Sequence, residues 1–257
     1  MSKVLTPSNP RGKRDIPFEL PEVSESEKRR AAKIFALLEQ RHPDAHCELD
    51  YTTPHELLIA TILSAQSTDV AVNKATPKLF ERFPTPADYA SASPKDIEPY
   101  IKTIGLFRNK AKHIHGAMRK VVDEFDGKIP QTMDELLTLP GVARKTAGVV
   151  LSEAFGIHMG VVVDTHVHRL SQQLGLVPEG TTIPMTERYL MALLPREKWG
   201  KISHLLIFHG RRVSPARGYD PKTLLEDPVC SRYCSRTAEL REKQKHAPSQ
   251  TKRKGSK

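Results

Sequence analysis

Cysteine and long hydrophobic runs are both scarce in this sequence. Its 257 residues include 3 cysteines, Cys47, Cys230 and Cys234, which are too few for a disulfide framework and indicate a reducing compartment. No apolar run approaches the roughly 20 residues that cross a bilayer. The basic N-terminus at 1–14 lacks the apolar segment of a secretory signal. We therefore expect a protein that neither spans a membrane nor is secreted.

Acidic residues are outnumbered, since 40 Lys and Arg face 30 Asp and Glu, for a net charge of +10. This balance indicates a polyanionic partner. Much of the excess lies in 241–257, which is predicted to be a disordered basic tail that attracts phosphate in a salt-sensitive way. A tail that only solubilises the chain is an alternative of at least equal weight. Residues 1–24 are predicted to form a disordered basic leader.

Strand patterns are nearly absent, because the only β-like run, at 161–163, lies between two helical segments. Helix signals recur instead. They are an apolar stripe in Glu25–Arg41, helix starts at Thr53-Pro54 and Ser93-Pro94, a capping box at Thr132 and Glu135, and glycine caps at Gly156 and Gly175. The predicted fold class is all-α.

One sequence pattern occurs twice, at 103–111 and at 139–147. In both segments an apolar helix end precedes a glycine (Gly105 or Gly141), an aliphatic residue and one further residue follow, and then comes an arginine with a second helix. This repeat predicts two helix–hairpin–helix units.

The second hairpin is the better candidate for a phosphate site. Gly141 allows the positive φ of a tight turn and lets the backbone approach a ligand. The helix that starts near Arg144 directs free N–H groups and its positive dipole end at an anion, and Arg144 and Thr146 can add side-chain donors. An ordinary turn between two helices is the alternative.

Two reactive side chains follow that hairpin. Lys145 lies in the first turn of the predicted helix, where the dipole and Arg144 favour the neutral, nucleophilic amine. Such an amine can attack C1′ of a deoxyribose, displace the base and form a Schiff base. Asp164 is expected to cap the next helix, and its carboxylate can also stabilise positive charge on the sugar. Taken alone, a solvated lysine and a plain cap are the alternatives.

Two other residues fit insertion into a DNA stack. Gln66, in the small polar segment 64–69, can fill the gap left by an extruded base. Leu106, at the tip of the first hairpin, can act as an apolar wedge between base steps. A loop glutamine and a core leucine are the alternatives when each is taken alone.

Together these segments closely resemble the endonuclease III family of DNA glycosylases with β-lyase activity. The resemblance runs from about residue 27 to 213, with motifs in the family's order at 57–60, 64–70, 72–76, 100–106, LPGVARKTA, VDTHVHR and 207–211. It implies Lys145 as the Schiff-base nucleophile and Asp164 as the catalytic carboxylate. The DNA-contact residues expected are Gln66, Gly105, Leu106, Gly141, Val142, Ala143, Arg144, Thr146, His166 and Arg169.

The resemblance also implies the domain organisation. Residues 49–159 are expected to form a six-helix barrel domain that carries the second hairpin. Residues 25–48 and 160–240 are expected to form a second helical domain built from both chain ends, with the active site in the cleft between the domains.

The sequence departs from the family at two places. The family hairpin usually reads Gly-x-Gly, whereas Ala143 stands here; its methyl is tolerated if the local φ is negative. Most relatives also hold a [4Fe–4S] cluster on Cys-x6-Cys-x2-Cys-x5-Cys, and projecting that spacing gives Ser214, Pro221, Leu224 and Cys230. Four thiolates are normally required, so we predict no cluster. We also predict no zinc, because the two cysteines lack a well-spaced second pair, and no other cofactor.

The function expected is that of a bifunctional glycosylase that removes oxidised pyrimidines and nicks the strand 3′ to the abasic site. Damaged double-stranded DNA is the expected partner of a monomer, in the cytoplasm or nucleoid of a bacterium, or in a nucleus or organelle. One alternative is a monofunctional mismatch glycosylase of the adenine type, a branch that usually lacks the lysine and carries an extra C-terminal domain. Another is a non-catalytic helix–hairpin–helix DNA-binding protein.

Overall fold

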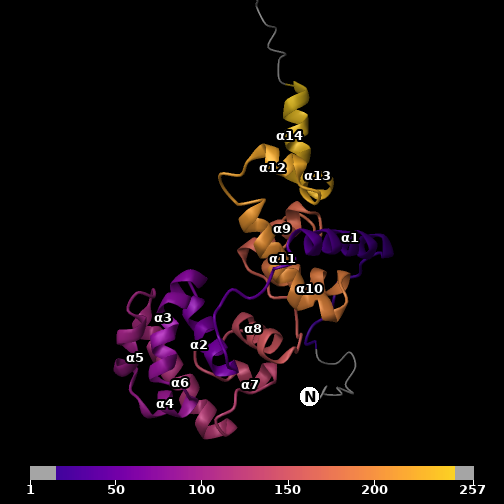
Figure 1. Cartoon of the computed structure of the whole chain (residues 1–257). Helices are drawn as coiled ribbons and strands as arrows, with labels where there is room; N and C mark the ends of the chain where they lie inside the picture. The colour runs from indigo at the N-terminus through magenta and orange to yellow at the C-terminus, as the bar shows by residue number, and fades with distance from the viewer. Residues whose placement is uncertain (1–15, 247–257) are drawn as a thin grey trace, which may run out of the picture. The chain divides into compact units, whose positions relative to one another are not determined.

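The computed structural model describes residues 16–246, and within that range the regular structure is helical, with no strand. The all-α prediction is confirmed. The chain divides into two compact units (Figure 1). Among the described residues, unit 1 comprises 16–20, 46–162 and 195–200, and unit 2 comprises 21–45, 163–194 and 201–246.

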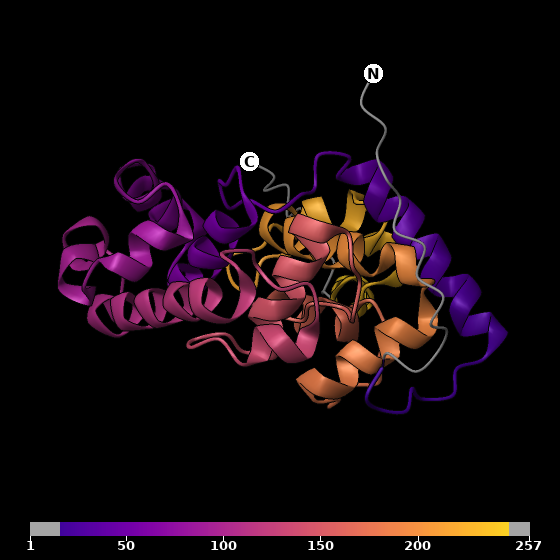
Figure 2. The same cartoon turned by 90° about the horizontal axis from the view of Figure 1, so that it is seen from below.

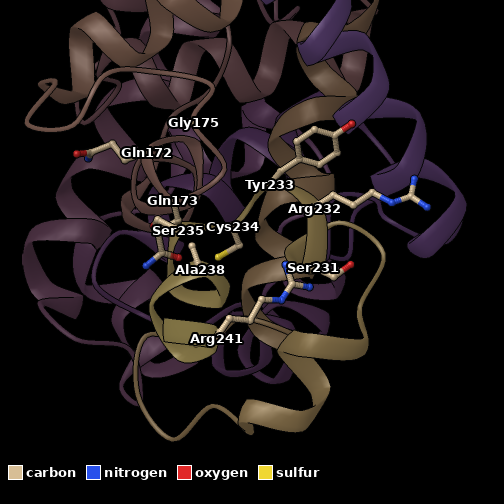
Figure 3. Close-up of a pocket in the computed structure, with 10 residues that line it drawn as sticks. All are labelled: Gln172, Gln173, Gly175, Ser231, Arg232, Tyr233, Cys234, Ser235, Ala238 and Arg241. Carbon is tan, nitrogen blue, oxygen red and sulfur yellow. The ribbon is translucent and has the colours of Figure 1, made fainter. Parts of the chain in front are cut away.

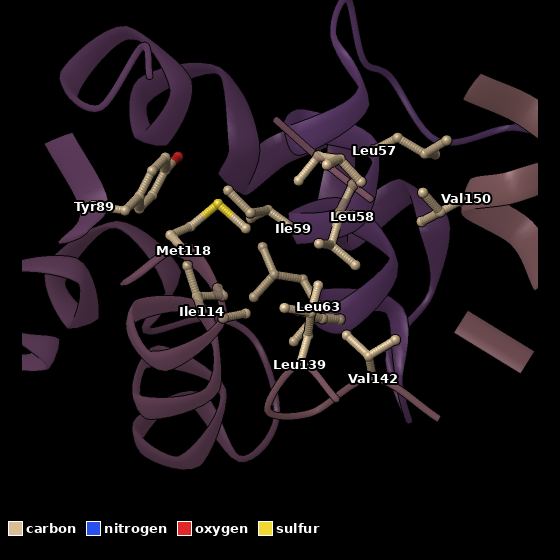
Figure 4. Close-up of a cluster of buried hydrophobic side chains, with 14 of the residues drawn as sticks. Leu57, Leu58, Ile59, Leu63, Tyr89, Ile114, Met118, Leu139, Val142 and Val150 are labelled. Carbon is tan, nitrogen blue, oxygen red and sulfur yellow. The ribbon is translucent and has the colours of Figure 1, made fainter. Parts of the chain in front are cut away.

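Unit 1 is built around helix α2 (Pro54–Ser64). Every side chain from Leu57 to Leu63 is buried, Leu57, Leu58, Ile59 and Leu63 completely (Figure 4). A helix that is apolar all round is stable only when other elements enclose it. Helices α3 (Asp69–Arg82), α6 (Phe107–Phe125) and α8 (Arg144–Phe155) provide that enclosure.

The remaining helices of unit 1 pack outside this core. Helices α4 (Pro86–Ser91) and α5 (Pro94–Ile101) pack against α6, which is 19 residues long (Figure 2). Helix α7 (Met133–Leu137) packs against α8, and the 3₁₀ helix η1 (Arg196–Lys198) follows much later in the chain. The Arg196 guanidinium donates to the His158 carbonyl at 2.7 Å. Residues 195–200 therefore belong with unit 1, although the sequence-based boundaries put them in the second domain.

Unit 2 contains α1 (Glu25–Arg41), α9 (Thr165–Gln173), α10 (Ile183–Leu193), most of α11 (Trp199–Arg212), α12 (Pro221–Glu226), α13 (Cys230–Tyr233) and α14 (Ser235–His246). Helix α10 contacts both α1 and α9, and α12, α13 and α14 contact one another. The Arg30 guanidinium on α1 donates to the carbonyls of Leu174 and Gly175 just after α9. This ties the first helix of the unit to a segment far away in sequence.

The helix boundaries follow the sequence signals closely. Thr53 accepts from the Glu56 amide at the start of α2, and Thr132 accepts from the Glu135 amide at the start of α7. Gly156 and Gly175 have φ values of 65° and 61° just beyond the ends of α8 and α9, as the glycine caps predict. No described helix is both long enough and apolar enough to cross a membrane.

The predicted disorder at the two ends needs one correction. The prediction of a disordered tail is wrong for 241–246, because these residues complete α14. Alternation of charged and polar residues hid this helix, because it has little apolar face to reveal its period. The leader prediction for 1–15 and the tail prediction for 247–257 lie outside the described residues, and residues 16–24 form an irregular segment before α1.

Candidate functional site

The second hairpin is a tight turn that only glycine can make here. Gly141 has φ +76°, and the Val142 amide closes the turn onto the Leu139 carbonyl at 3.2 Å. A Cβ added to Gly141 would lie 2.7 Å from Cβ of His113, on α6. Backbone conformation and close packing on α6 therefore both require a residue without a side chain.

Helix α8, which follows that turn, begins without a side-chain cap. Ala143 is its N-cap residue and has no side-chain acceptor for a capping hydrogen bond, whereas a Ser or Thr side chain caps α1, α2, α3, α4 and α7. The first amides of a helix have no intrahelical acceptor, so an uncapped start presents donors to an anion. Ala143 has φ −94°, which confirms that its methyl is tolerated.

Lys145 is the second residue of α8 and its side chain is exposed. It therefore lies at the end of α8 where the amide donors are. Arg144 stacks over the ring of Phe18 at 5.2 Å, and Thr146 is half-buried beside it. Val142 is only 8 % exposed, so this residue can offer a ligand its backbone but little of its side chain.

The first hairpin resembles the second in sequence but differs in backbone conformation. Its left-handed residue is Leu106, at φ 58°, and Gly105 does not have a positive φ. Leu106 serves as the N-cap residue of α6, again without a side-chain cap, and its side chain is 60 % exposed. A large apolar side chain is thus displayed to solvent at the tip of the turn.

Gln66 has the same unusual backbone. It follows α2, is exposed and has φ 57°. Among the described residues the non-glycine residues with positive φ are Gln66, Leu106 and Asp126, and Asp126 caps the C-terminus of α6. Strained residues of this kind cost of order 1–3 kcal/mol and collect at functional sites. Both residues predicted to enter DNA therefore carry an independent structural signal.

Lys110 joins the two segments that display these residues, and the sequence reasoning missed it. Its buried ammonium donates to the Leu63 carbonyl at 2.8 Å, to the Ala65 carbonyl and to Ser67 Oγ at 3.2 Å. Its own amide donates to the Leu106 carbonyl at 3.1 Å. Burial lowers the pKa of Lys110. A lysine on the buried face of an amphipathic helix was the signal available in the sequence.

Asp164 belongs to unit 2, whereas Lys145 belongs to unit 1. Asp164 is half-buried and caps α9, because its Oδ1 accepts from the Val167 amide at 2.8 Å. The predicted cap is confirmed, and this bond fixes the direction of the carboxylate while its second oxygen is not used by the cap.

His166 and Arg169 follow Asp164 on α9. Nδ1 of His166 is buried without a hydrogen-bond partner. The Arg169 guanidinium donates to Gln173 Oε1 at 2.9 Å and to the Ser214 carbonyl at 2.8 Å. Arg169 therefore holds together parts of unit 2, which limits its freedom to reach a ligand.

The four positions projected for cluster ligands do not fit a [4Fe–4S] group. Ser214 and Leu224 are completely buried, Pro221 begins α12, and Cys230 is the one thiol among them. Neither leucine nor proline can ligate iron, and the cluster normally requires four thiolates. Leu224 and Val229, each 0 % exposed, are instead part of the packed interior of this segment.

Comparison with known proteins gives the class. Residues 59–196 match the model of the HhH-GPD superfamily of base excision DNA repair proteins. The geometry above, with its uncapped hairpin helices and an exposed lysine, is thus that of a helix–hairpin–helix DNA repair protein.

Individual proteins that this chain resembles are endonuclease III enzymes. The one from Synechocystis sp. is 56% identical over 75% of this chain and 87% of its own length, and the one from Bacillus subtilis is 44% identical over 66% and 77%. A solved structure of a trapped endonuclease III–DNA covalent intermediate superposes with a TM-score of 0.77 at 38% identity, covering 86% of this chain and 100% of that one. The chain belongs to the endonuclease III family, and is a DNA-binding base-excision-repair glycosylase with AP lyase activity.

Proposed function

We propose that this chain removes oxidised pyrimidines of the thymine glycol type from double-stranded DNA and nicks the strand 3′ to the abasic site. The observation that carries the proposal is Lys145, exposed in the first turn of the uncapped helix α8, directly after the Gly141 turn. A primary amine beside a set of phosphate-binding amides is placed to act on the sugar of a bound nucleotide.

In the proposed reaction Nζ of Lys145 attacks C1′ and forms a C1′–N bond as the glycosidic bond breaks and the base leaves with a proton. The sugar ring opens to give a Schiff base. Loss of a C2′ proton then allows the C3′–O bond to break, with the 3′ phosphate as leaving group. The carboxylate of Asp164 stabilises the positive charge that develops on the sugar and assists activation of Lys145.

DNA is held by the two hairpins. The first amides of α6 and α8, which no side chain caps, bind backbone phosphates and so set position without reading sequence. Gln66 and Leu106 enter the base stack where the damaged nucleotide is extruded, and their exposure and fixed left-handed backbone support that role. We further propose that the chain acts as a monomer, that it is located in the compartment that contains the cell's DNA, and that it holds no [4Fe–4S] cluster.

Borohydride trapping on a duplex with one thymine glycol tests the assignment. The wild-type chain should form a covalent protein–DNA adduct and Lys145→Ala should form none. Lys78→Ala is the matched control, because Lys78 is an exposed lysine on α3, and its adduct yield should equal the wild type's. An adduct that survives in Lys145→Ala refutes the assignment of the nucleophile.

A panel of duplexes separates the substrate classes. Incision of thymine glycol and other oxidised pyrimidines, with little on an adenine mismatch, is the expected result. Excision of the mismatched adenine without strand cleavage would favour the monofunctional alternative. Tight binding with no cleavage of any lesion by the wild type would favour the non-catalytic one.

A further inference from the structure

Unit 2 contains a buried cluster of potential metal ligands that the proposed reaction does not use. His209 on α11, Asp227 after α12 and Cys230 at the start of α13 are 0 %, 5 % and 0 % exposed. Each offers one ligand atom, and these atoms lie within 4.8 Å of one another. Nε2 of His209 is 3.2 Å from Sγ of Cys230.

We propose that His209, Asp227 and Cys230 bind a single zinc ion. Imidazole nitrogen, thiolate sulfur and carboxylate oxygen are the ligands that zinc takes in proteins, at about 2.0–2.3 Å. Tetrahedral geometry with those bond lengths separates the ligand atoms by about 3.5 Å. The distance between His209 and Cys230 must open by only a few tenths of an ångström to admit the ion.

The surroundings of His209 support a ligand role. Nδ1 of His209 is 3.1 Å from Nε2 of His42, which is itself buried at 1 % exposure. With Nε2 of His209 bound to the ion, Nδ1 carries the ring proton and donates a hydrogen bond to Nε2 of His42. Metal-bound histidines almost always have such a partner, which fixes the tautomer and the ring orientation.

The carboxylate of Asp227 is also held in place. Its Oδ1 accepts from the amides of Val229 and Cys230 at 2.9 Å, and Oδ2 lies 3.2 Å from Nε of Arg41. Hydrogen-bonded ligand carboxylates are typical of metal sites. With Cys230 as thiolate, Cys230 and Asp227 supply two negative charges, which balance a dication in a buried place where an unbalanced charge is costly.

Cys234 lies next to the three proposed ligands and gives the ion a route to them. It follows α13, is 4 % exposed, and its thiol is hydrogen-bonded to that of Cys230. It also lines a pocket of about 260 Å³ with residues of α9 and α14 (Figure 3). Sequence spacing led us to expect no zinc because it shows two cysteines alone, whereas the fold brings His209 and Asp227 to them.

Metal content and cobalt substitution of the full chain test the proposal. We expect one zinc per chain after purification by a method without metal columns. After removal of zinc, Co²⁺ alone should bind one equivalent and give the intense near-ultraviolet band of a thiolate–cobalt bond. Cys230→Ser and His209→Asn should abolish tight binding of both ions, while Cys47→Ser, in unit 1, should leave them unchanged.

A wild-type chain that takes up neither Zn²⁺ nor Co²⁺ would overturn the proposal. The three side chains would then be only a hydrogen-bonded cluster in the interior of unit 2. Cobalt bound without a thiolate band, or zinc retained by Cys230→Ser, would also overturn it, as would iron with acid-labile sulfide in place of zinc. The spectrum of the wild type decides the matter even if a variant fails to fold. Borohydride trapping through Lys145 is measured separately, so failure here leaves the proposed reaction intact.

Discussion

Replacing Lys110 by methionine should impair lesion recognition through the loop that carries Gln66. The Lys110 ammonium donates to the Leu63 and Ala65 carbonyls and to Ser67 Oγ, which flank Gln66 on both sides. Methionine has a similar length and fills the same buried space, but it donates no hydrogen bond. The perturbation therefore removes the anchor of the loop with little change in packing volume.

The magnitude follows from the groups left without a donor. Hydrogen bonds from a charged donor contribute about 1.5–3 kcal/mol each, and an unsatisfied buried carbonyl costs about 1–3 kcal/mol. Two carbonyls are affected, while removal of a buried cation offsets part of the loss. We expect the free energy of unfolding to fall by about 2–4 kcal/mol, and the melting temperature by about 5–10 °C.

Lys110→Met should also slow excision, and a control variant on the same helix should not. Single-turnover excision of thymine glycol should slow by about tenfold or more, corresponding to about 1.4 kcal/mol of lost loop organisation. Lys120→Met is the matched control on the same helix: Lys120 is half-buried and pairs with Glu124 at 3.5 Å, and such a pair contributes about 0–1 kcal/mol. Its excision rate should match that of the wild type.

A double-mutant cycle with Gln66→Ala tests whether Lys110 acts through this loop. If it does, the losses of excision rate in Lys110→Met and Gln66→Ala overlap, and the double variant is little worse than the poorer single one. Fully additive losses, or amide exchange at 65–67 unchanged by Lys110→Met, would show that the reasoning is wrong. Lys110 would then be a structural lysine without a positioning role.

Three other substitutions give separate outcomes. Gly141→Ala should weaken DNA binding and lower stability more than Gly127→Ala, since both have positive φ but only Gly141 packs against His113; equal melting temperatures would contradict this. Leu106→Ala should leave the melting temperature within about 1 °C, because the Leu106 side chain is 60 % exposed. The variant should excise the lesion from paired DNA more slowly than the wild type, but form the adduct at a single-stranded abasic site at the wild-type rate. Wild-type rates on both substrates would exclude a wedge role for Leu106. Asp164→Asn should keep the helix cap, because asparagine also caps helices, at a cost below about 0.5 kcal/mol. The variant should nevertheless lose borohydride trapping. Full trapping would show that Asp164 acts only as a helix cap.

The sequence was sufficient for features that depend on local chemistry. Thr53, Thr132, Gly156 and Asp164 occupy the helix ends that their residue types predict. These positions depend on hydrogen bonds within a few residues, so a single sequence contains the information. The amine of Lys145 at the start of α8 follows from the same local pattern.

Features that depend on contacts between distant segments were not predictable. The bond from Lys110 to Leu63 joins residues 47 apart, and that from His209 to Cys230 joins residues 21 apart. The two hairpins align in sequence, yet the left-handed residue is Gly141 in one and Leu106 in the other. Packing against neighbouring elements decides which residue bears the turn, and one sequence without the fold does not contain that information.

The burial of every side chain from Leu57 to Leu63 on α2 has a consequence for the motions of the protein. A helix enclosed on all sides exchanges its amide hydrogens only when the whole unit opens, so 58–63 should be among the slowest-exchanging amides of unit 1. Gln66 lies just beyond that helix, and Lys110 ties its flanks to Leu63 at the helix end. Gln66, the residue proposed to enter the base stack, is thus attached to the part of the unit that opens least often, and we expect it to fluctuate less than most surface loops.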